Sequence, residues 1–317
     1  MRIVNFLRKF ILFSAFGLTF CTMSRAQHRP DLGDLEKALR NEVEFFCDTM
    51  QRGRGFGGSG KFHSTAYLRN RFEGAGLLPL GGSYIHEFEY NGKYGRNIVG
   101  FRPGSQRNNY VVVSSYVDGL GLLAGKIYPG ADSNASGMAA LLSLADSLCC
   151  TGPSVIFVAF DGRNANFSGS EAFWKELAGG RLCTPDGAVV RPYMVRQMVN
   201  IDIIGSTLAP VHPRWREYVI VLGDKRQYES IMLQNSIHSL GLRVENSYYG
   251  SRDFTDLFYR RIGDQRVFIR NGIPALVWTS GITDNTNKVT DLPVTLDYPV
   301  FARRVELLRR YLEAYRR

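Results

Sequence analysis

The chain has 317 residues, of which 44% are hydrophobic and 21% are charged, and it includes 20 Phe and 16 Tyr. This composition can form a large buried core and excludes an intrinsically disordered protein. No run of 18 apolar residues follows the N-terminal segment, so the sequence also excludes a polytopic membrane protein.

The N-terminal segment has the order of an export signal. Three basic residues precede a largely apolar run over residues 10–20, and a small-residue cleavage pattern follows at residues 24–26. This order predicts a secretory signal peptide over residues 1–26 that is cleaved before Gln27. We therefore expect an exported protein, in the periplasm, the cell envelope or the extracellular space, with no transmembrane segment in the mature chain.

Two alternatives for this segment stay open. A membrane anchor needs about 20 apolar residues to cross a bilayer core, and this run has 11. Lipid attachment at Cys21 is disfavoured, because bulky Phe20 stands where lipoprotein signals have a small residue. Cleavage removes four basic residues and lowers the formal net charge from +10 to +6, a balance that gives no support to nucleic-acid binding.

Helical and strand patterns alternate along the rest of the chain. Apolar residues at helical spacing predict helices over residues 35–52, 64–74, 137–148, 170–177, 226–240 and 254–260. Short β-branched runs predict strands over residues 97–101, 110–115, 155–160, 198–204, 218–222 and 275–279. Several of these runs are apolar at successive positions, which is typical of strands buried on both faces. The order predicts an α/β fold, a three-layer α/β/α sandwich with a largely parallel mixed central sheet, in one domain over residues 27–317.

The C-terminal segment, residues 303–317, is rich in arginine. Its apolar side chains recur at helical spacing, at Leu307, Leu308, Tyr311, Leu312 and Tyr315. This pattern predicts an amphipathic helix with a solvated basic face and does not indicate a nucleic-acid surface.

Several patterns that would suggest other chemistry lack their context. Residues 55–60 match G-x-G-x-x-G, but they follow a helical pattern instead of a strand, so no dinucleotide site is predicted. The chain has no Walker A motif and no G-x-S-x-G motif, and none of its five histidines follows a predicted strand. No C-x-x-C spacing occurs. Disulfide pairing stays open among Cys47, Cys149, Cys150 and Cys183.

The segments that follow the predicted strands are distinctive, and ligands of open α/β sheets bind at such positions. Four blocks stand in order: V-V-V-S-S-Y-V-D-G at 111–119, G-A-D-S-N-A-S-G at 130–137, V-I-F-V-A-F-D-G-R-N-A-N-F-S-G-S at 155–170, and M-V-N-I-D-I-I-G at 198–205. Together they resemble the exported zinc aminopeptidase and glutaminyl cyclase family, the twenty-eighth metallopeptidase family. The resemblance covers roughly residues 50–315 and implies a zinc exopeptidase-like fold.

The resemblance also implies a metal site, on which the activity of this family depends. Family members bind one or two zinc ions through His, Asp, Glu, Asp and His side chains, and a further Glu acts as the general base. Zinc polarises the scissile carbonyl and lowers the pKa of its bound water, while the base takes the proton. A complete site would therefore imply aminopeptidase or glutaminyl cyclase activity.

Most of the matching positions carry other residues in this chain. The first histidine of the family corresponds to Tyr116, the metal-bridging aspartate to Ser133, and the last histidine to Asn287. The general base and the liganding Glu beside it correspond to Arg163 and Asn164. Tyr, Ser and Asn are poor zinc ligands, and an arginine cannot accept a proton at the position of the base.

Three aspartates remain near the strand ends, Asp118, Asp132 and Asp202, and Asp202 is the only retained family ligand. We therefore expect a vestigial pocket of eight residues with no catalytic residue, no bound zinc and no other cofactor. The loss of a metal would leave these carboxylates without a cation, which is costly in a partly buried site. Arg163 is accordingly predicted to occupy the former metal space and to pair with Asp202 or with one of the other two aspartates.

Three functions stay open at this point. The first is a non-catalytic binding or scaffold protein with an unknown peptide or protein ligand. The second is an active metal-dependent aminopeptidase or glutaminyl cyclase that uses replacement ligands. In the third, Asp118, Asp132 and Asp202 hold a hard cation such as Ca²⁺ or Mg²⁺. The three aspartates also have a simpler possible role than cation binding, in which they accept hydrogen bonds from backbone amides at the strand ends.

Overall fold

The computed structural model describes residues 31–149, 152–209, 211 and 215–315. The predicted signal peptide and Cys150 lie outside these ranges. Within them, no helix has the length and apolar character that a membrane span requires. The cysteines that these ranges contain, Cys47, Cys149 and Cys183, are free thiols.

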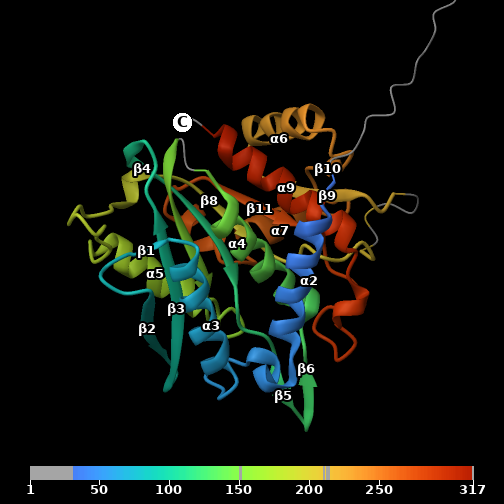
Figure 1. Ribbon diagram of the computed structural model, residues 1–317, viewed down its shortest axis with the longest axis horizontal. Coiled ribbons are helices and arrows are strands. Elements are labelled where there is room, and N and C mark those ends of the chain that lie inside the picture. Colours follow the sequence, from blue (N-terminus) through green and yellow to red (C-terminus); the bar gives the residue numbers. More distant parts are fainter. Residues whose placement is uncertain (1–30, 150–151, 210, 212–214, 316–317) are drawn as a thin grey trace, which may run out of the picture.

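A mixed sheet forms the centre of the fold (Figure 1). Within the described residues it has nine strands in the order β1-β3-β7-β4-β8-β11-β9-β10, with β2 beside β3. These strands are β1 (Leu78–Pro79), β2 (Ile85–Tyr90), β3 (Lys93–Arg102), β4 (Gln106–Tyr116), β7 (Pro153–Phe160), β8 (Val195–Ile201), β9 (Tyr218–Leu222), β10 (Arg243–Glu245) and β11 (Ala275–Thr279). A separate hairpin consists of β5 (Gly121–Leu123) and β6 (Lys126–Tyr128).

The four central strands β7, β4, β8 and β11 run parallel to one another, whereas β3 and β9 are antiparallel to their inner neighbours. The carboxyl ends of the central strands therefore meet at one edge of the sheet, where open α/β sheets bind ligands. The sheet is of the largely parallel mixed kind that the sequence predicts.

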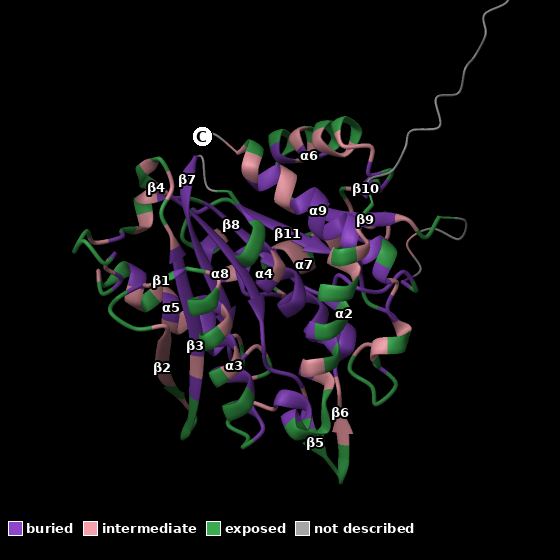
Figure 2. Cartoon of the chain, viewed as in Figure 1, coloured by how far each residue is buried: buried purple, intermediate pink, exposed green. Residues whose placement is uncertain are grey.

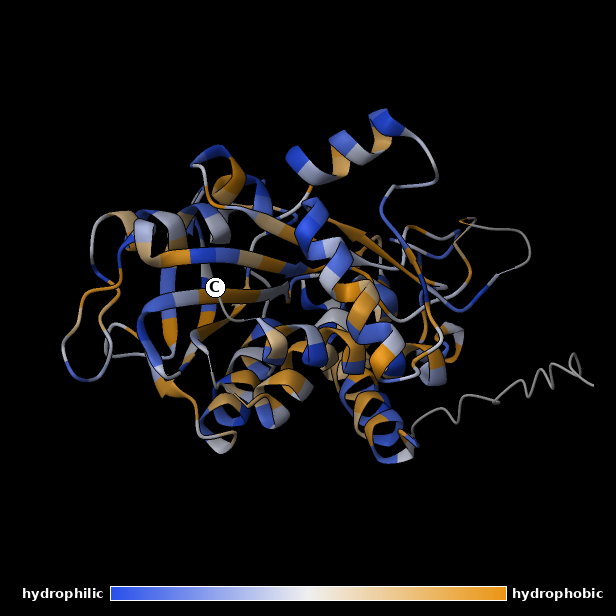
Figure 3. Ribbon diagram, turned by 90° about the horizontal axis from the view of Figure 1, so that it is seen from above, coloured by the Kyte–Doolittle hydropathy of each residue, from blue (hydrophilic) through white to orange (hydrophobic). Residues whose placement is uncertain are grey.

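Helices cover both faces of this sheet. They are α2 (Gly33–Cys47), α3 (Lys61–Gly74), α4 (Ser136–Ser147), α5 (Ser168–Ala178), α6 (Lys225–Ile237), α7 (Arg252–Arg260), α8 (Gln265–Arg270) and α9 (Tyr298–Ala314). Buried side chains of α2, α3, α4, α6 and α9 pack on one face, and those of α5 and α8 pack on the other. Figure 3 shows apolar strands between these helical layers, which confirms the three-layer α/β/α sandwich.

The apolar runs of the strands supply both layers of the core. In β4, Val111 and Val113 face the layer of α2, α4 and α9, whereas Val112 faces α5 and α8. Alternate side chains of a strand point to opposite faces, so a strand covered on both sides must be apolar at successive positions. All eight residues of β7 are buried for the same reason, and the central strands are buried along much of their length in Figure 2.

The C-terminal helix α9 corrects one prediction, because two of its arginines are buried and do not belong to a solvated basic face. Arg303 is 6% exposed and Arg304 is fully buried. The guanidinium of Arg304 donates to the carbonyl oxygens of Tyr218 (2.6 Å), Ile204 (2.8 Å) and Ser206 (2.8 Å). Helices α2, α4 and α6 pack around α9, so they cover sides of the helix that its amphipathic pattern leaves to solvent.

The glycine-rich segment 53–60 begins within a 3₁₀ helix, Thr49–Arg54, and does not follow a strand, as the sequence indicates. Its glycines permit close packing. A Cβ on Gly60 would lie 2.2 Å from the carbonyl oxygen of Gln51, and one on Gly53, where φ is +66°, would lie 2.6 Å from the carbonyl oxygen of Gly121 in β5. The segment therefore anchors the β5–β6 hairpin, and it lacks the strand-to-helix turn of a dinucleotide site.

Candidate functional site

A cavity of about 200 Å³ lies at the carboxyl ends of the central strands. Six of the eight residues predicted to form the pocket line it: Tyr116, Ser133, Arg163, Asn164, Asp202 and Asn287. The other two, Asp118 and Asp132, are buried beside it. The topology thus brings together segments that are far apart in the sequence, as expected for the strand ends of a parallel sheet.

Arg163 and Asp202 form an ion pair in this cavity. Nη1 of Arg163 lies 2.6 Å from Oδ2 of Asp202, and the two side chains are 16% and 11% exposed. The predicted pairing of the Arg163 guanidinium with one of the three aspartates is therefore confirmed. Burial raises the pKa of Asp202, and the guanidinium opposes this rise. Burial also acts against the charge of Arg163, but the neighbouring carboxylates, above all that of Asp202, raise the pKa of Arg163 overall.

The Arg163 side chain is also held by aromatic rings. Its guanidinium carbon lies 4.3 Å from the ring centre of Tyr116 and 5.4 Å from that of Phe167, so it makes cation–π contacts with both. Burial raises the pKa of Tyr116 well above the ordinary tyrosine value. Tyr116 therefore serves as a neutral wall of the cavity at physiological pH.

Asp118 orders the loop that carries Arg163. Its carboxylate accepts hydrogen bonds from the backbone N–H groups of Arg163 (2.8 Å) and Asn164 (3.0 Å), and from the side-chain amide of Asn164 (3.3 Å). Asp118 is fully buried. Its oxygens are thus used to satisfy backbone donors, which is the simpler of the two roles considered for the aspartates.

Asp132 has a similar role at the next strand end. Its Oδ1 atom accepts hydrogen bonds from the backbone N–H groups of Gly205 (2.8 Å) and Ser206 (3.2 Å) and from the hydroxyl of Ser136 (3.2 Å). Its Oδ2 atom is buried and has no partner among the described residues. Burial, together with the nearby carboxylate of Asp291, raises the pKa of Asp132 to about 7.

Asp291 belongs to the site but was not predicted from the sequence. It is fully buried, and its carboxylate accepts hydrogen bonds from the backbone N–H of Asp132 (2.7 Å), the backbone N–H of Ser133 (3.0 Å) and the hydroxyl of Ser133 (2.6 Å). The backbone N–H of Asn287 in turn donates to the Ser133 hydroxyl (3.4 Å). Asp291 lies in an irregular loop before α9, where no periodic pattern marks a buried residue.

Asp264 is a second buried acid that was not predicted. It precedes α8 and is fully buried, and neither of its carboxylate oxygens has a hydrogen-bond partner among the described residues. The hydroxyl of Ser170 lies near Asp264, but it donates its hydrogen bond to the carbonyl oxygen of Phe167. Burial raises the pKa of Asp264 to about 7, although the charge of Arg163 opposes the rise. The sequence carries no signal for this burial, because α8 has six residues.

The remaining wall of the cavity is apolar and aromatic, and sequence reasoning did not identify it. It includes Tyr248, Phe258, Ile262, Val277 and Ile282. The rings of Tyr248 and Phe258 stack at a centroid distance of 4.0 Å. These residues come from α7, from β11 and from the loops beside them, so only the tertiary structure brings them to the strand ends.

The residues predicted to stand at metal-ligand positions do not fit a zinc ion. Within the described ranges, no group of three or more His, Cys, Asp or Glu side chains is arranged to hold a metal. Asp202, which the sequence comparison predicts to be the one retained ligand, forms an ion pair with a guanidinium. Zinc sites in proteins are built from thiolate, imidazole and carboxylate ligands, and Tyr116, Ser133 and Asn287 supply none of these.

Comparison with known proteins defines the family. Residues 97–303, about two thirds of the chain, match the model of Peptidase family M28. The chain belongs to this family. No curated protein sequence matches this M28 chain.

Solved structures show the same fold for this member of family M28. The glutaminyl cyclase of Fimbriiglobus ruber is 17% identical, with a TM-score of 0.68 over 91% of this chain and 97% of that chain. A glutaminyl cyclase of Porphyromonas gingivalis is 16% identical, with a TM-score of 0.61 over 89% and 98%. BSAP, a zinc aminopeptidase from Bacillus subtilis, is 10% identical, with a TM-score of 0.63 over 89% and 95%. The family resemblance and the α/β fold expected from the four sequence blocks are both confirmed.

Proposed function

We propose that this chain is an exported, non-catalytic member of peptidase family M28 that binds a peptide or protein ligand at the strand-end cavity. The observation that carries the proposal is the ion pair between Arg163 and Asp202. We also propose that residues 1–26 are removed on export and that residues 27–317 form one domain.

The ion pair supports a site without metal chemistry. A guanidinium supplies the positive charge that the retained carboxylate needs, so Asp202 is neutralised without a metal. Arg163 also replaces the acid that would accept the proton of a zinc-bound water. With zinc ligands absent at Tyr116, Ser133 and Asn287, the cavity lacks both parts of the family mechanism.

The contacts of Asp118, Asp132 and Asp202 do not favour the alternative in which these residues bind Ca²⁺ or Mg²⁺. Asp118 and Asp132 direct carboxylate oxygens at backbone N–H groups, and Asp202 pairs with Arg163. A Ca²⁺ or Mg²⁺ ion would have to displace these donors and approach a buried positive charge. We therefore do not propose this function.

The shape and charge of the cavity support one class of ligand. Its volume of about 200 Å³ matches one large side chain and is too small for a whole peptide. Its walls include Tyr248, Phe258, Ile262 and Ile282. The two charged side chains that line it, Arg163 and Asp202, pair with each other. An uncharged, apolar or aromatic side chain of a partner protein or peptide complements these walls best.

Metal content and activity test the absence of catalysis. Protein purified without chelators is analysed for zinc and assayed on aminoacyl and N-terminal glutaminyl substrates. We expect less than stoichiometric zinc and no turnover. One tightly bound zinc per chain, lost in Asp202→Ala together with hydrolysis or cyclisation, would favour the alternative of an active enzyme with replacement ligands. Terminal sequencing of the exported protein tests cleavage before Gln27.

Side-chain probes test the ligand class directly. We expect N-acetyl amides of Leu and Phe to bind in an NMR titration, and those of Asp and Lys to leave the spectrum unchanged. Ile282→Trp adds bulk to a side chain that lines the cavity and is expected to abolish binding. The matched control is Val294→Trp, at an apolar residue that is 83% exposed and does not line the cavity. Equal binding by both variants would contradict the proposed site.

A further inference from the structure

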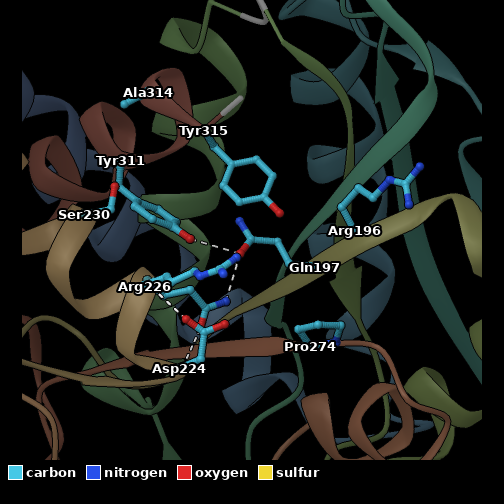
Figure 4. Close-up of a pocket in the computed structure, with 10 residues that line it drawn as sticks. Arg196, Gln197, Asp224, Arg226, Ser230, Pro274, Tyr311, Ala314 and Tyr315 are labelled. Carbon is cyan, nitrogen blue, oxygen red and sulfur yellow. Dashed lines mark hydrogen bonds between the residues drawn. The ribbon is translucent and has the colours of Figure 1, made fainter. Parts of the chain in front are cut away.

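A second cavity, of about 180 Å³, lies at the opposite edge of the sheet, where β8 and β11 begin (Figure 4). Its lining residues include Arg196 and Gln197 near the start of β8, Pro274 before β11, and residues of α6 and α9. The strand-end cavity lies where these same strands finish. The two sites are therefore separated by the length of the central strands.

The floor of this second cavity carries a buried amide with an unused donor. Gln197 is 1% exposed, and its Nε2 atom has no hydrogen-bond partner among the described residues. Its Oε1 atom accepts two hydrogen bonds, one from the hydroxyl of Tyr311 (3.0 Å) and one from Nε2 of Gln227 (3.0 Å). A buried N–H group without an acceptor destabilises the folded protein, so an oxygen bound in the cavity would be stabilised by accepting from it.

The orientation of this amide is set by its neighbours. Gln227 is part of a capping box at the start of α6: its Oε1 atom accepts from the backbone N–H of Asp224 (2.7 Å), and its own backbone N–H donates to Asp224 (2.8 Å). The Nε2 group of Gln227 must then point to Gln197. If Gln197 were flipped, two NH₂ groups would face each other, so the unpaired donor cannot be removed by exchanging its amide atoms.

The rim of the cavity is basic. The Arg226 side chain lines it and forms no ion pair or hydrogen bond with its guanidinium within the described part of the chain. Arg196 also lines the rim and donates through Nε to the side chain of Asn109 (2.5 Å). The one acid in the lining, Asp224, is engaged as the N-cap of α6. Two arginines against one acid, at the N-terminus of a 13-residue helix, favour an anion.

We propose that this second cavity binds a small oxyanion, such as inorganic phosphate or a small dicarboxylate. One oxygen accepts from Nε2 of Gln197, and the guanidinium of Arg226 pairs with the charge. The volume of about 180 Å³ has room for several water molecules and therefore admits an ion of this size. The site is independent of the strand-end cavity and of its proposed ligand.

The test uses the mature chain and two probes, inorganic phosphate and malonate, titrated against chloride at constant ionic strength. We expect at least one probe to raise the melting temperature in a saturable manner, and calorimetry to give one site per chain. Arg226→Gln is expected to weaken binding by about ten-fold or more with the unliganded melting temperature little changed, since Arg226 is exposed. The matched control is Arg252→Gln, at an exposed arginine at the start of α7, outside the cavity lining. The two probes distinguish phosphate from carboxylate as the source of the oxygens.

A second variant tests the buried donor itself. Gln197→Glu keeps the oxygen that accepts from Tyr311 and Gln227, and it replaces the unpaired NH₂ group by a carboxylate oxygen. We expect this built-in anion to abolish phosphate and malonate binding while the circular dichroism spectrum is preserved. Two results would overturn the proposal. Equal stabilisation of the unaltered protein and of Arg226→Gln would show an unspecific salt effect, and no saturable stabilisation would show that water alone fills the cavity.

Discussion

The carboxylate of Asp291 accepts two hydrogen bonds from Ser133, one from its backbone N–H (3.0 Å) and one from its hydroxyl (2.6 Å), across 158 positions of sequence. A third bond comes from the backbone N–H of Asp132. Asp291 therefore holds the loop before α4 against the loop before α9, on the border of the strand-end cavity.

Replacement of Asp291 by alanine is expected to lower the free energy of unfolding by about 3–5 kcal/mol, because three buried donors lose a charged acceptor. Asp291→Asn, which keeps one acceptor oxygen, is expected to lose less. Urea denaturation followed by circular dichroism measures both. Asp284→Ala, in the same loop but exposed, is the control and should stay within about 0.5 kcal/mol of the unaltered protein. A similarly small effect of Asp291→Ala would refute the role assigned to this carboxylate.

Removal of one partner of the Arg163–Asp202 ion pair is expected to leave a mostly buried charge alone. Arg163→Met should cost about 2–4 kcal/mol, somewhat less than for a fully buried pair because both side chains keep some solvent contact. In a double-mutant cycle with Asp202→Asn, we expect a coupling energy of at least about 1 kcal/mol. Additive effects of the two changes would mean that the pair contributes nothing specific.

Placing an acid at position 163 gives a sharper test of the proposed absence of catalysis. Arg163→Glu reinstates the residue type of the family's base but places a third carboxylate near Asp202 and Asp118 without a cation. We expect destabilisation and no hydrolysis in the presence of zinc, because Tyr116 and Ser133 still lack ligand atoms. Zinc-dependent turnover from this one change would show that the site retains more of its machinery than we infer.

The pH dependence of stability should report on Asp264. Its pKa is raised from 3.8 to about 7 in the folded protein, so between about pH 4 and pH 7 the folded state holds a proton that the unfolded state has lost. The free energy of unfolding therefore falls as the pH rises through this window, by at most about 1.4 kcal/mol per pH unit for one group. The pKa of Asp132 is also raised to about 7, so this residue contributes a fall of the same sign. Asp264→Asn is therefore expected to reduce the fall without abolishing it, and Asp253→Asn, at an exposed residue, to leave it unchanged. Urea unfolding measured at half-unit pH steps gives the slope of the free energy of unfolding against pH. An Asp264→Asn slope equal to that of the unaltered protein would contradict the prediction.

Arg304 is expected to be one of the least replaceable residues of α9. Its buried guanidinium satisfies the carbonyl oxygens of Tyr218, Ile204 and Ser206. Arg304→Met keeps much of the stem but leaves these three acceptors unpaired, so we expect a loss of about 3 kcal/mol or more, or failure to fold. Arg310→Met on the same helix, where the guanidinium contacts Glu306 at a more accessible position, should cost less than about 1 kcal/mol. Thermal melts of the two variants provide the comparison.

The strands of the central sheet could be predicted because their burial has a local signature. Residues 110–113 and 155–160 are apolar at successive positions, because a strand with helices on both sides buries the side chains of both its faces. The shortest elements had no such signature: β10 has three residues, and α8 has six. Periodicity needs more than one or two turns or pleats before it can be distinguished from chance.

Some features of the candidate site could likewise be predicted from the sequence, and others could not. The pairing of Arg163 with one of three aspartates, Asp118, Asp132 or Asp202, could be predicted, because a basic residue expected among carboxylates has a defined electrostatic consequence. The burial of Asp264 and Asp291 could not, because both precede helices in irregular segments and acquire their surroundings from distant strands. The buried arginines of α9 were mispredicted for a related reason. Amphipathic periodicity assumes one solvated face, and α9 has neighbours on several sides.

The contacts of α9 also bear on when the protein can acquire its structure. Core residues of this helix, among them Phe301, Leu307 and Leu308, belong to the same hydrophobic cluster as residues of α2 and α4. Arg304 donates hydrogen bonds to carbonyl oxygens some 100 positions earlier in the sequence. A nascent chain that ends before residue 298 lacks all of these groups. Native contacts of such long sequence separation form late. Protease resistance of ribosome-bound chains should therefore appear only after α9 has emerged. The polypeptide would then stay unfolded throughout most of its synthesis, a state compatible with the export proposed above.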